Sequence, residues 1–244
     1  PRDMVHVCLY VPNLIGYARI VLLFVCYAVA RAPASASPRA PRRPTPPPAP
    51  RFRPPHPARR LRDWKLAASC YMLSFAGDLF DGWAARKFDQ TSQFGYVLDM
   101  VTDRCATTGL ISILCGLYPK WIPSLLFCQM LDLGSHWYHM YSTSTERGHH
   151  KSKEALAERN VVLRMYYGSY PLFAYLCVGA EFFWIALYVL HYAPDFGVGP
   201  LRLAFVCRYG FAPAMALKSV VNLAQFGSAA ENLALRDMEK QGKK

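Results

Sequence analysis

The chain has 244 residues, of which 53% are hydrophobic and 14% aromatic, and its formal net charge is +12. The apolar residues gather in long runs that match the thickness of a bilayer core, and no stacked basic and aromatic pattern favours RNA or DNA. We therefore expect a membrane protein whose positive charge faces anionic lipid headgroups and which binds no nucleic acid.

Residues 4–10 are apolar, and after the segment 11–19 an apolar run covers residues 20–30, so that the whole stretch has about the length of a span. Pro12 and Asn13 suit the start of a helix. Arg19 lies near the entrance of this run. It either extends towards the lipid headgroups or contacts a substrate phosphate, and the residues alone leave both open.

Residues 31–62 are dense in proline, alanine and arginine. This composition cannot bury a core and favours extended conformations. We predict a disordered insertion within a single membrane domain that covers residues 1–244. Residues 231–244 are predicted to be a charged C-terminal tail that frays from the end of a helix.

Two further spans, 64–86 and 93–118, are joined by a short polar turn. Four aspartates occupy the ends that meet at this turn: Asp78, Asp81, Asp99 and Asp103. On helices, each pair lies on one face because side chains three or four residues apart line up. Carboxylates gathered in poorly hydrated surroundings need hard cations, so the pattern predicts a divalent-metal site. The alternative is a set of helix-end acids that face water.

These residues belong to the pattern Asp-x2-Asp-Gly-x2-Ala-Arg-x8-Gly-x3-Asp-x3-Asp, which resembles the signature of the CDP-alcohol phosphotransferases. Every fixed position is filled. The resemblance implies that the four aspartates bind Mg²⁺ or Mn²⁺ and that Asp103, the last of them, acts as general base. The other fixed positions are expected substrate contacts: Gly82, Ala85, Arg86 and Gly95.

Two segments resemble the phosphatidylinositol synthases within that family. One is Pro-Asn-Leu-Ile-Gly-Tyr-x-Arg, which implies that Asn13 and Arg19 contact substrate. The other is Ser135-His136-Trp137, in a fourth span over 121–141. Asp132 lies one turn before His136, and this pair either serves the acceptor or only joins helices.

The charged loop 146–159 precedes a fifth span that ends near residue 191. By resemblance, Lys151 and Arg164 hold anionic groups near the acceptor. Tyr170 departs from the pattern, since many relatives have arginine there.

A sixth span over 203–230 is interrupted by Pro213. Basic and amide side chains within a membrane span need a partner. They either pair with substrate phosphate or with the signature aspartates, or they only face the interior of the helix bundle. Those side chains are Arg208, Lys218 and Asn222.

The expected fold is therefore all-α, an integral membrane bundle of about six transmembrane helices with both termini on one side. The positive-inside bias puts that side, and the aspartates, at the cytosol. The basic residues that set this orientation are Arg86, Lys87, Arg147, Lys151, Lys153, Arg159, Arg236, Lys240, Lys243 and Lys244. The resemblance adds the endoplasmic reticulum and a homodimer.

The activity that the resemblance implies is transfer of the phosphatidyl group from CDP-diacylglycerol to myo-inositol, with release of CMP. Two alternatives remain open at this point. The same chemistry serves other acceptors, namely glycerol 3-phosphate, serine, choline or ethanolamine, and intramembrane acids also occur in transporters that need no nucleotide.

Overall fold

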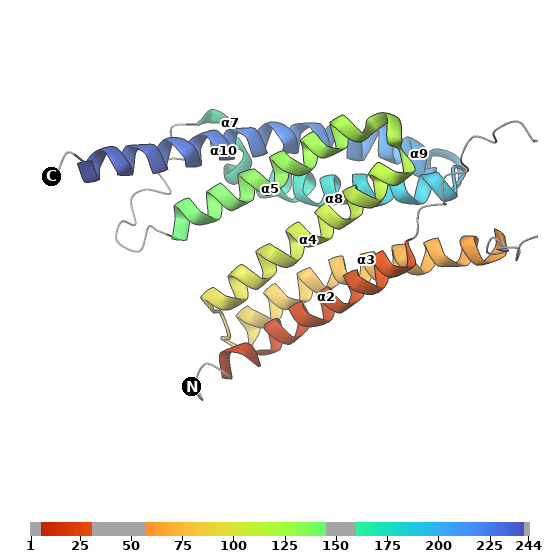
Figure 1. The fold of residues 1–244 in the computed structure, drawn as a ribbon, viewed down its shortest axis with the longest axis horizontal. Helices are drawn as coiled ribbons and strands as arrows, with labels where there is room; N and C mark the ends of the chain where they lie inside the picture. Colours follow the sequence, from red (N-terminus) through yellow and green to blue (C-terminus); the bar gives the residue numbers. More distant parts are fainter. Residues whose placement is uncertain (1–5, 31–56, 145–159, 242–244) are drawn as a thin grey trace, which may run out of the picture. The chain divides into compact units, whose positions relative to one another are not determined.

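The structure is a computed structural model that describes residues 6–30, 57–144 and 160–241 (Figure 1). All regular structure in these ranges is helical. Most of the predicted insertion, residues 31–56, lies outside the described residues, and so does the loop 145–159. The chain divides into two compact units, Pro1–Asp99 and Met100–Lys244, and the division falls inside one helix.

The first unit contains α2 (Val11–Val29), α3 (Pro57–Lys87) and the start of α4 (Gln93–Leu117). Pro12 stands in the first turn of α2, where its missing N–H costs nothing. Ala67, Cys70, Tyr71 and Ser74 are buried on one face of α3 because they are three or four residues apart. Small side chains on this face let α2 and α3 approach closely.

The second unit runs from the rest of α4 through α5 (Ile122–Ser144) and α8 (Tyr170–Tyr192) to α10 (Ala212–Gln241). The long helix α10 packs against both α5 and α8. A Cβ added to Gly179 on α8 would lie 2.5 Å from the Cβ of Ala214 on α10. Glycine at this position therefore permits the close helix contact.

The short elements of this unit are η1 (Pro119–Trp121), α7 (Val161–Gly168), η2 (Gly199–Leu201), α9 (Leu203–Val206) and the π-helical turn η3 (Cys207–Phe211). The core cluster forms where α7 meets α8 and α10. Its buried members are Leu163, Tyr166, Leu176, Ala214 and Val221.

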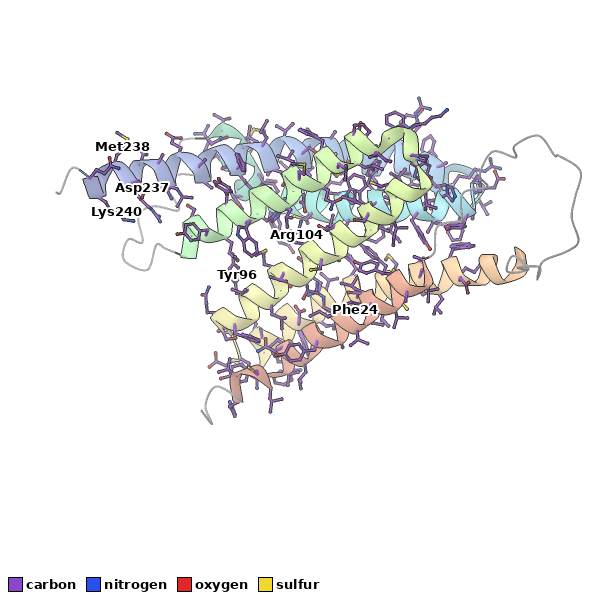
Figure 2. The ribbon with its side chains drawn as sticks, viewed as in Figure 1. Phe24, Tyr96, Arg104, Asp237, Met238 and Lys240 are labelled. Carbon is purple, nitrogen blue, oxygen red and sulfur yellow. The ribbon has the colours of Figure 1, made fainter. Side chains whose placement is uncertain are left out.

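Among the described residues, three helices are long and apolar enough to cross a membrane: α2, α4 and α8. Large apolar side chains on their surfaces are exposed, for example Phe24 at 70% (Figure 2). Such exposure suits contact with lipid. The predicted count of about six spans is not established by length and composition, since α3, α5 and α10 fall outside this criterion.

Several predicted boundaries were wrong. The second helix begins at Pro57, so the last residues of the predicted insertion are helical. The segment that leads into the fifth span forms a helix of its own, α7, and the span is α8; the two are separated at Ser169, whose backbone is extended. Pro171 stands in the first turn of α8, where its missing N–H costs nothing, so the sequence favours the start of a new helix here.

The sixth span is interrupted near Pro213, as predicted: the π-helical turn η3 separates α9 from α10. Pro213 stands in the first turn of α10, where its missing N–H costs nothing. Residues 231–241, predicted to fray, continue α10. They are tied to α5 by Asn232, which donates to Ser142 Oγ at 2.9 Å, and by Arg236, which donates to the Ser142 carbonyl at 3.1 Å.

Candidate active site

Arg19 lies at the centre of the polar side chains in the first unit. It stands on the buried face of α2 with Asn13 and Gly16, at intervals of three residues, and its side chain is 3% exposed. A Cβ added to Gly77 on α3 would lie 2.8 Å from Arg19 Cγ. Gly77 thus leaves room for the arginine stem, and sequence reasoning missed this residue although it directly precedes Asp78.

Three of the predicted metal ligands surround the Arg19 guanidinium. Nη2 lies 2.9 Å from Asp78 Oδ1, and Nη1 lies 2.7 Å from Asp81 Oδ2 and 2.9 Å from Asp99 Oδ1. Three formal negative charges therefore face one positive charge. The remaining negative charge, on hard oxygen atoms, fits a divalent cation. Neither of the two predicted roles of Arg19, headgroup or phosphate contact, included this pairing.

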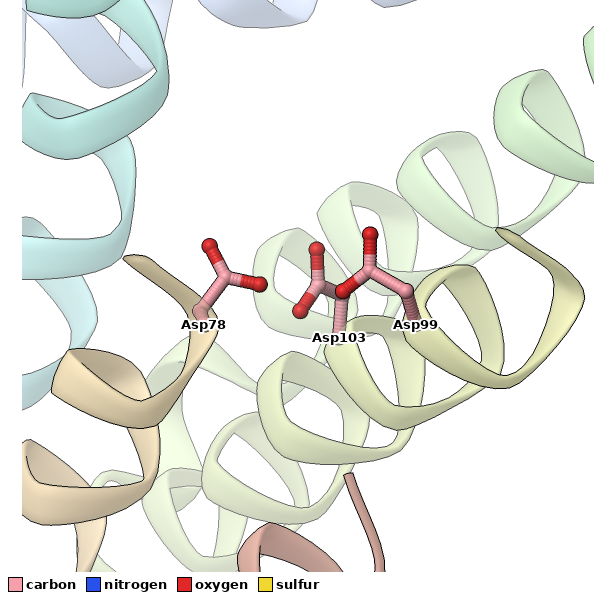
Figure 3. Close-up of side chains that lie close together, drawn as sticks. All are labelled: Asp78, Asp99 and Asp103. Carbon is pink, nitrogen blue, oxygen red and sulfur yellow. The ribbon is translucent and has the colours of Figure 1, made fainter. Parts of the chain in front are cut away.

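Asp103 follows Asp99 by one turn of the continuous helix α4, so the helix itself brings the two carboxylates together. Taking one carboxylate oxygen from each residue, Asp78, Asp99 and Asp103 lie within 4.8 Å of one another (Figure 3). Oxygen donors at this spacing suit Mg²⁺ or Mn²⁺. Asp81 is not part of this group; it is 7% exposed and turned to Arg19.

The start of α4 packs against α2 through two predicted substrate contacts. A Cβ added to Gly95 would lie 2.9 Å from Asn13 Oδ1 and 3.1 Å from Ser92 Oγ, so the contact requires glycine. Asn13 is 1% exposed and its Nδ2 donates to the Val7 carbonyl at 2.7 Å. The structure thus shows Asn13 and Gly95 in a helix-packing contact.

The remaining predicted contacts differ in their surroundings. Gly82 and Ala85 are partly buried on α3, and Arg86 is exposed in its last turn. A Cβ added to Gly82 would meet only the Arg86 guanidinium, at an ordinary 3.6 Å. Arg164 lies on the exposed face of α7. Lys151 lies outside the described residues.

A second polar cluster lies within the second unit, around Asp132 on α5. Its carboxylate accepts hydrogen bonds from Arg104 Nη1 on α4 and, at 3.1 Å, from Asn222 Nδ2 on α10. His136 Nδ1 is 3.5 Å from Asp132 Oδ1 and closer, 2.8 Å, to the Asp132 backbone carbonyl. The predicted pairing of Asp132 with His136 is therefore present, but Arg104 is the partner that sequence reasoning missed.

Lys218, one of the predicted buried cations, has a partner in the same unit. Its Nζ donates to Tyr166 Oη at 3.0 Å and lies 4.9 Å from the centre of that ring. Arg208 instead lies in the π-helical turn, next to the ring of Tyr209 at 5.6 Å.

Comparison with known proteins places the whole arrangement in a family. Residues 9–192 match the family described as CDP-alcohol phosphatidyltransferase. The chain is 37% identical over 242 residues to a protein of Mus musculus and 36% identical over 243 residues to one of Homo sapiens, with 98% of each chain covered. It is 32% identical over 252 residues to one of Schizosaccharomyces pombe, covering 97% of this chain and 93% of the relative.

Each of these three relatives is named CDP-diacylglycerol–inositol 3-phosphatidyltransferase. No solved structure matched the chain. The matched segment covers most of the sequence and contains the four aspartates of the signature pattern, Asp78, Asp81, Asp99 and Asp103. The chain belongs to the CDP-alcohol phosphatidyltransferase family.

Proposed function

We propose that this protein transfers the phosphatidyl group from CDP-diacylglycerol to myo-inositol and releases CMP. The grouping of Asp78, Asp99 and Asp103 on α3 and α4 carries this proposal. Relatives of the same activity, similar over nearly the whole length, support inositol as the acceptor.

The aspartates are proposed to hold Mg²⁺ or Mn²⁺, which would neutralise the donor diphosphate and the charge that develops on CMP. Asp78, Asp81 and Asp99 serve as ligands together with Asp103. The ion pairs of Arg19 keep these carboxylates close together, since one guanidinium offsets part of their mutual repulsion.

Asp103 is proposed as the general base as well. The inositol hydroxyl oxygen attacks the phosphorus next to diacylglycerol, the bond from that phosphorus to the CMP oxygen breaks, and the hydroxyl proton passes to the Asp103 carboxylate. Arg86, exposed beside this motif, is placed to bind an anionic group of the donor. Gly82 and Ala85 leave space on the same face of α3.

The membrane setting is part of the proposal. We propose that α3, α5 and α10 also cross the bilayer, giving six spans with the aspartates at the cytosolic face of the endoplasmic reticulum. Their buried polar side chains lower their hydropathy without preventing insertion. A homodimer surrounded by membrane lipids completes the proposed assembly.

The test is CMP release by the purified protein in detergent with labelled CDP-diacylglycerol. We expect release to require both a divalent cation and inositol. Glycerol 3-phosphate, serine, choline and ethanolamine serve as competing acceptors. CMP release that depends on serine and not on inositol contradicts the assignment of inositol as the acceptor. The absence of any metal-dependent CMP release favours the transporter alternative.

A further inference from the structure

The polar cluster around Asp132 fixes side chains from three helices. Both oxygens of the Asp132 carboxylate are engaged, Oδ2 by Arg104 and Oδ1 by Asn222. The cluster joins three helices, α4, α5 and α10, in the second unit. Asp132 thereby holds the Arg104 and Asn222 side chains in fixed positions.

Two polar atoms of these side chains remain without a hydrogen-bond partner among the described residues. They are Asn222 Oδ1 and Arg104 Nε, both buried. Asn222 is only 2% exposed. Its amide cannot be turned around, because Oδ1 would then face the Asp132 carboxylate. A buried polar atom without a partner is unfavourable, so a ligand that satisfies it is favoured.

The unpartnered atoms have complementary chemistry. Asn222 Oδ1 accepts a hydrogen bond and Arg104 Nε donates one. A hydroxyl group does both, so the hydroxyls of a polyol match the chemistry of both atoms. A simple ammonium or phosphate group offers only donors or only acceptors.

The formal charges around the site disfavour an anionic ligand. Arg104 is paired with Asp132 and also faces Asp103, while Lys218 is buried and Glu181 half-buried in the same unit. Lys218 donates to Tyr166, while Glu181 accepts from Thr107 Oγ1 at 2.8 Å. A phosphate-bearing acceptor needs surplus basic groups, whereas among these residues the acids outnumber the bases.

The cluster adjoins the proposed base. Arg104 follows Asp103 in α4, and its Nη2 lies 3.9 Å from Asp103 Oδ2. A polyol bound by Arg104 is therefore held next to the carboxylate that takes its proton.

We propose that Arg104 and Asn222, oriented by Asp132, form the subsite that binds the hydroxyls of the acceptor polyol. This inference rests on the proposed function and assigns specificity for inositol to these two side chains. Asn222 is the sharper test, since its carbonyl oxygen has no other partner among the described residues.

The experiment compares Asn222→Ala with Asn232→Ala. Both asparagines lie buried on α10 and both donate a hydrogen bond to α5, but Asn232 contacts Ser142, ten residues along that helix from Asp132. We expect N222A to raise the KM for inositol about tenfold, with the KM for CDP-diacylglycerol changed less than about twofold. N232A is expected to leave both constants near those of the unsubstituted protein.

Thermal unfolding in detergent with CMP, with and without inositol, is measured beside the kinetics. We expect inositol to raise the unfolding temperature of the unsubstituted protein and of N232A, and not of N222A. If N222A fails to fold, Asn222→Ser takes its place, because its hydroxyl avoids a fully apolar neighbour for Asp132 but is too short to replace both amide groups.

An unchanged KM for inositol in N222A, or in N222S where N222A does not fold, overturns the subsite while the proposed function stands. An equal loss in N232A also overturns it, since that result indicates helix packing. If the unsubstituted protein itself shows no inositol-dependent CMP release, the proposed function fails first and the subsite with it.

Discussion

The two polar clusters of this protein balance their charges in opposite ways. Around Arg19, three carboxylates face one guanidinium, two of them on α3 and one on α4. Around Asp132, one carboxylate is shared by a guanidinium and an amide. The first cluster has more carboxylates than basic groups, and this excess negative charge favours a cation. In the second cluster, the unsatisfied groups are hydrogen-bonding atoms, namely Asn222 Oδ1 and Arg104 Nε. We therefore propose that the same residue types serve cation binding in one place and recognition of the acceptor in the other.

The largest effect is expected from Asp103→Asn. The amide cannot take a proton, so CMP release in the presence of inositol should fall by about a thousandfold. The thermal unfolding temperature in detergent should change little, because the side chain is only partly buried. Substantial turnover by this variant would remove Asp103 as the base.

Asp132→Asn tests the balanced cluster. Loss of the charge leaves the buried Arg104 without its closest partner, and we expect the free energy of unfolding to fall by about 3 kcal/mol. Added Mn²⁺ should not restore it, because this cluster has no excess of carboxylates. Chemical denaturation in detergent, with and without Mn²⁺, measures both quantities. Recovery on adding Mn²⁺ would contradict the contrast drawn between the clusters.

Arg19→Gln tests the acidic cluster in the same assay. Without the guanidinium, Asp78, Asp81 and Asp99 repel one another, so the variant should lose about 2–3 kcal/mol of stability in chelator. Mn²⁺ should recover more than half of this loss, and the unfolding temperature should depend more steeply on Mn²⁺ than in the unsubstituted protein. Equal losses with and without the ion would mean that the acids hold no cation.

The smallest effect is expected from Gly77→Ala. The new methyl group would lie 2.8 Å from Arg19 Cγ, and the arginine stem must shift, at a cost of about 1–2 kcal/mol. Gly227→Ala on α10 is the control, since an added Cβ there meets nothing within 4 Å and helix propensity alone should stabilise it slightly. Thermal unfolding of the pair separates packing from propensity. A stabilised G77A would show that Arg19 is not confined by α3.

The helices themselves were largely predictable. Apolar runs of the length of a bilayer core predicted α2, α4 and α8 well, and proline and polar turns marked most of their ends. The interruption near Pro213 was predicted, but its π-helical form and the break at Ser169 were not, because both depend on backbone hydrogen bonding that hydropathy does not report. Spans were also predicted over the segments of α3, α5 and α10, but the polar groups of these helices lower their hydropathy, so length and composition do not establish that they cross a membrane.

Spacing along the chain by itself determined that Asp99 and Asp103 share a helix face, as do Asp78 and Asp81, because helical geometry follows from local hydrogen bonding. Tertiary structure alone decided which side chains meet from different helices: Arg19 among the acids, Gly77 beside its stem, and Asn222 with Arg104 on Asp132. These pairs are separated by tens of residues, and periodicity carries no information about the partner across a helix interface. Only the packing of complete helices brings them within hydrogen-bonding distance.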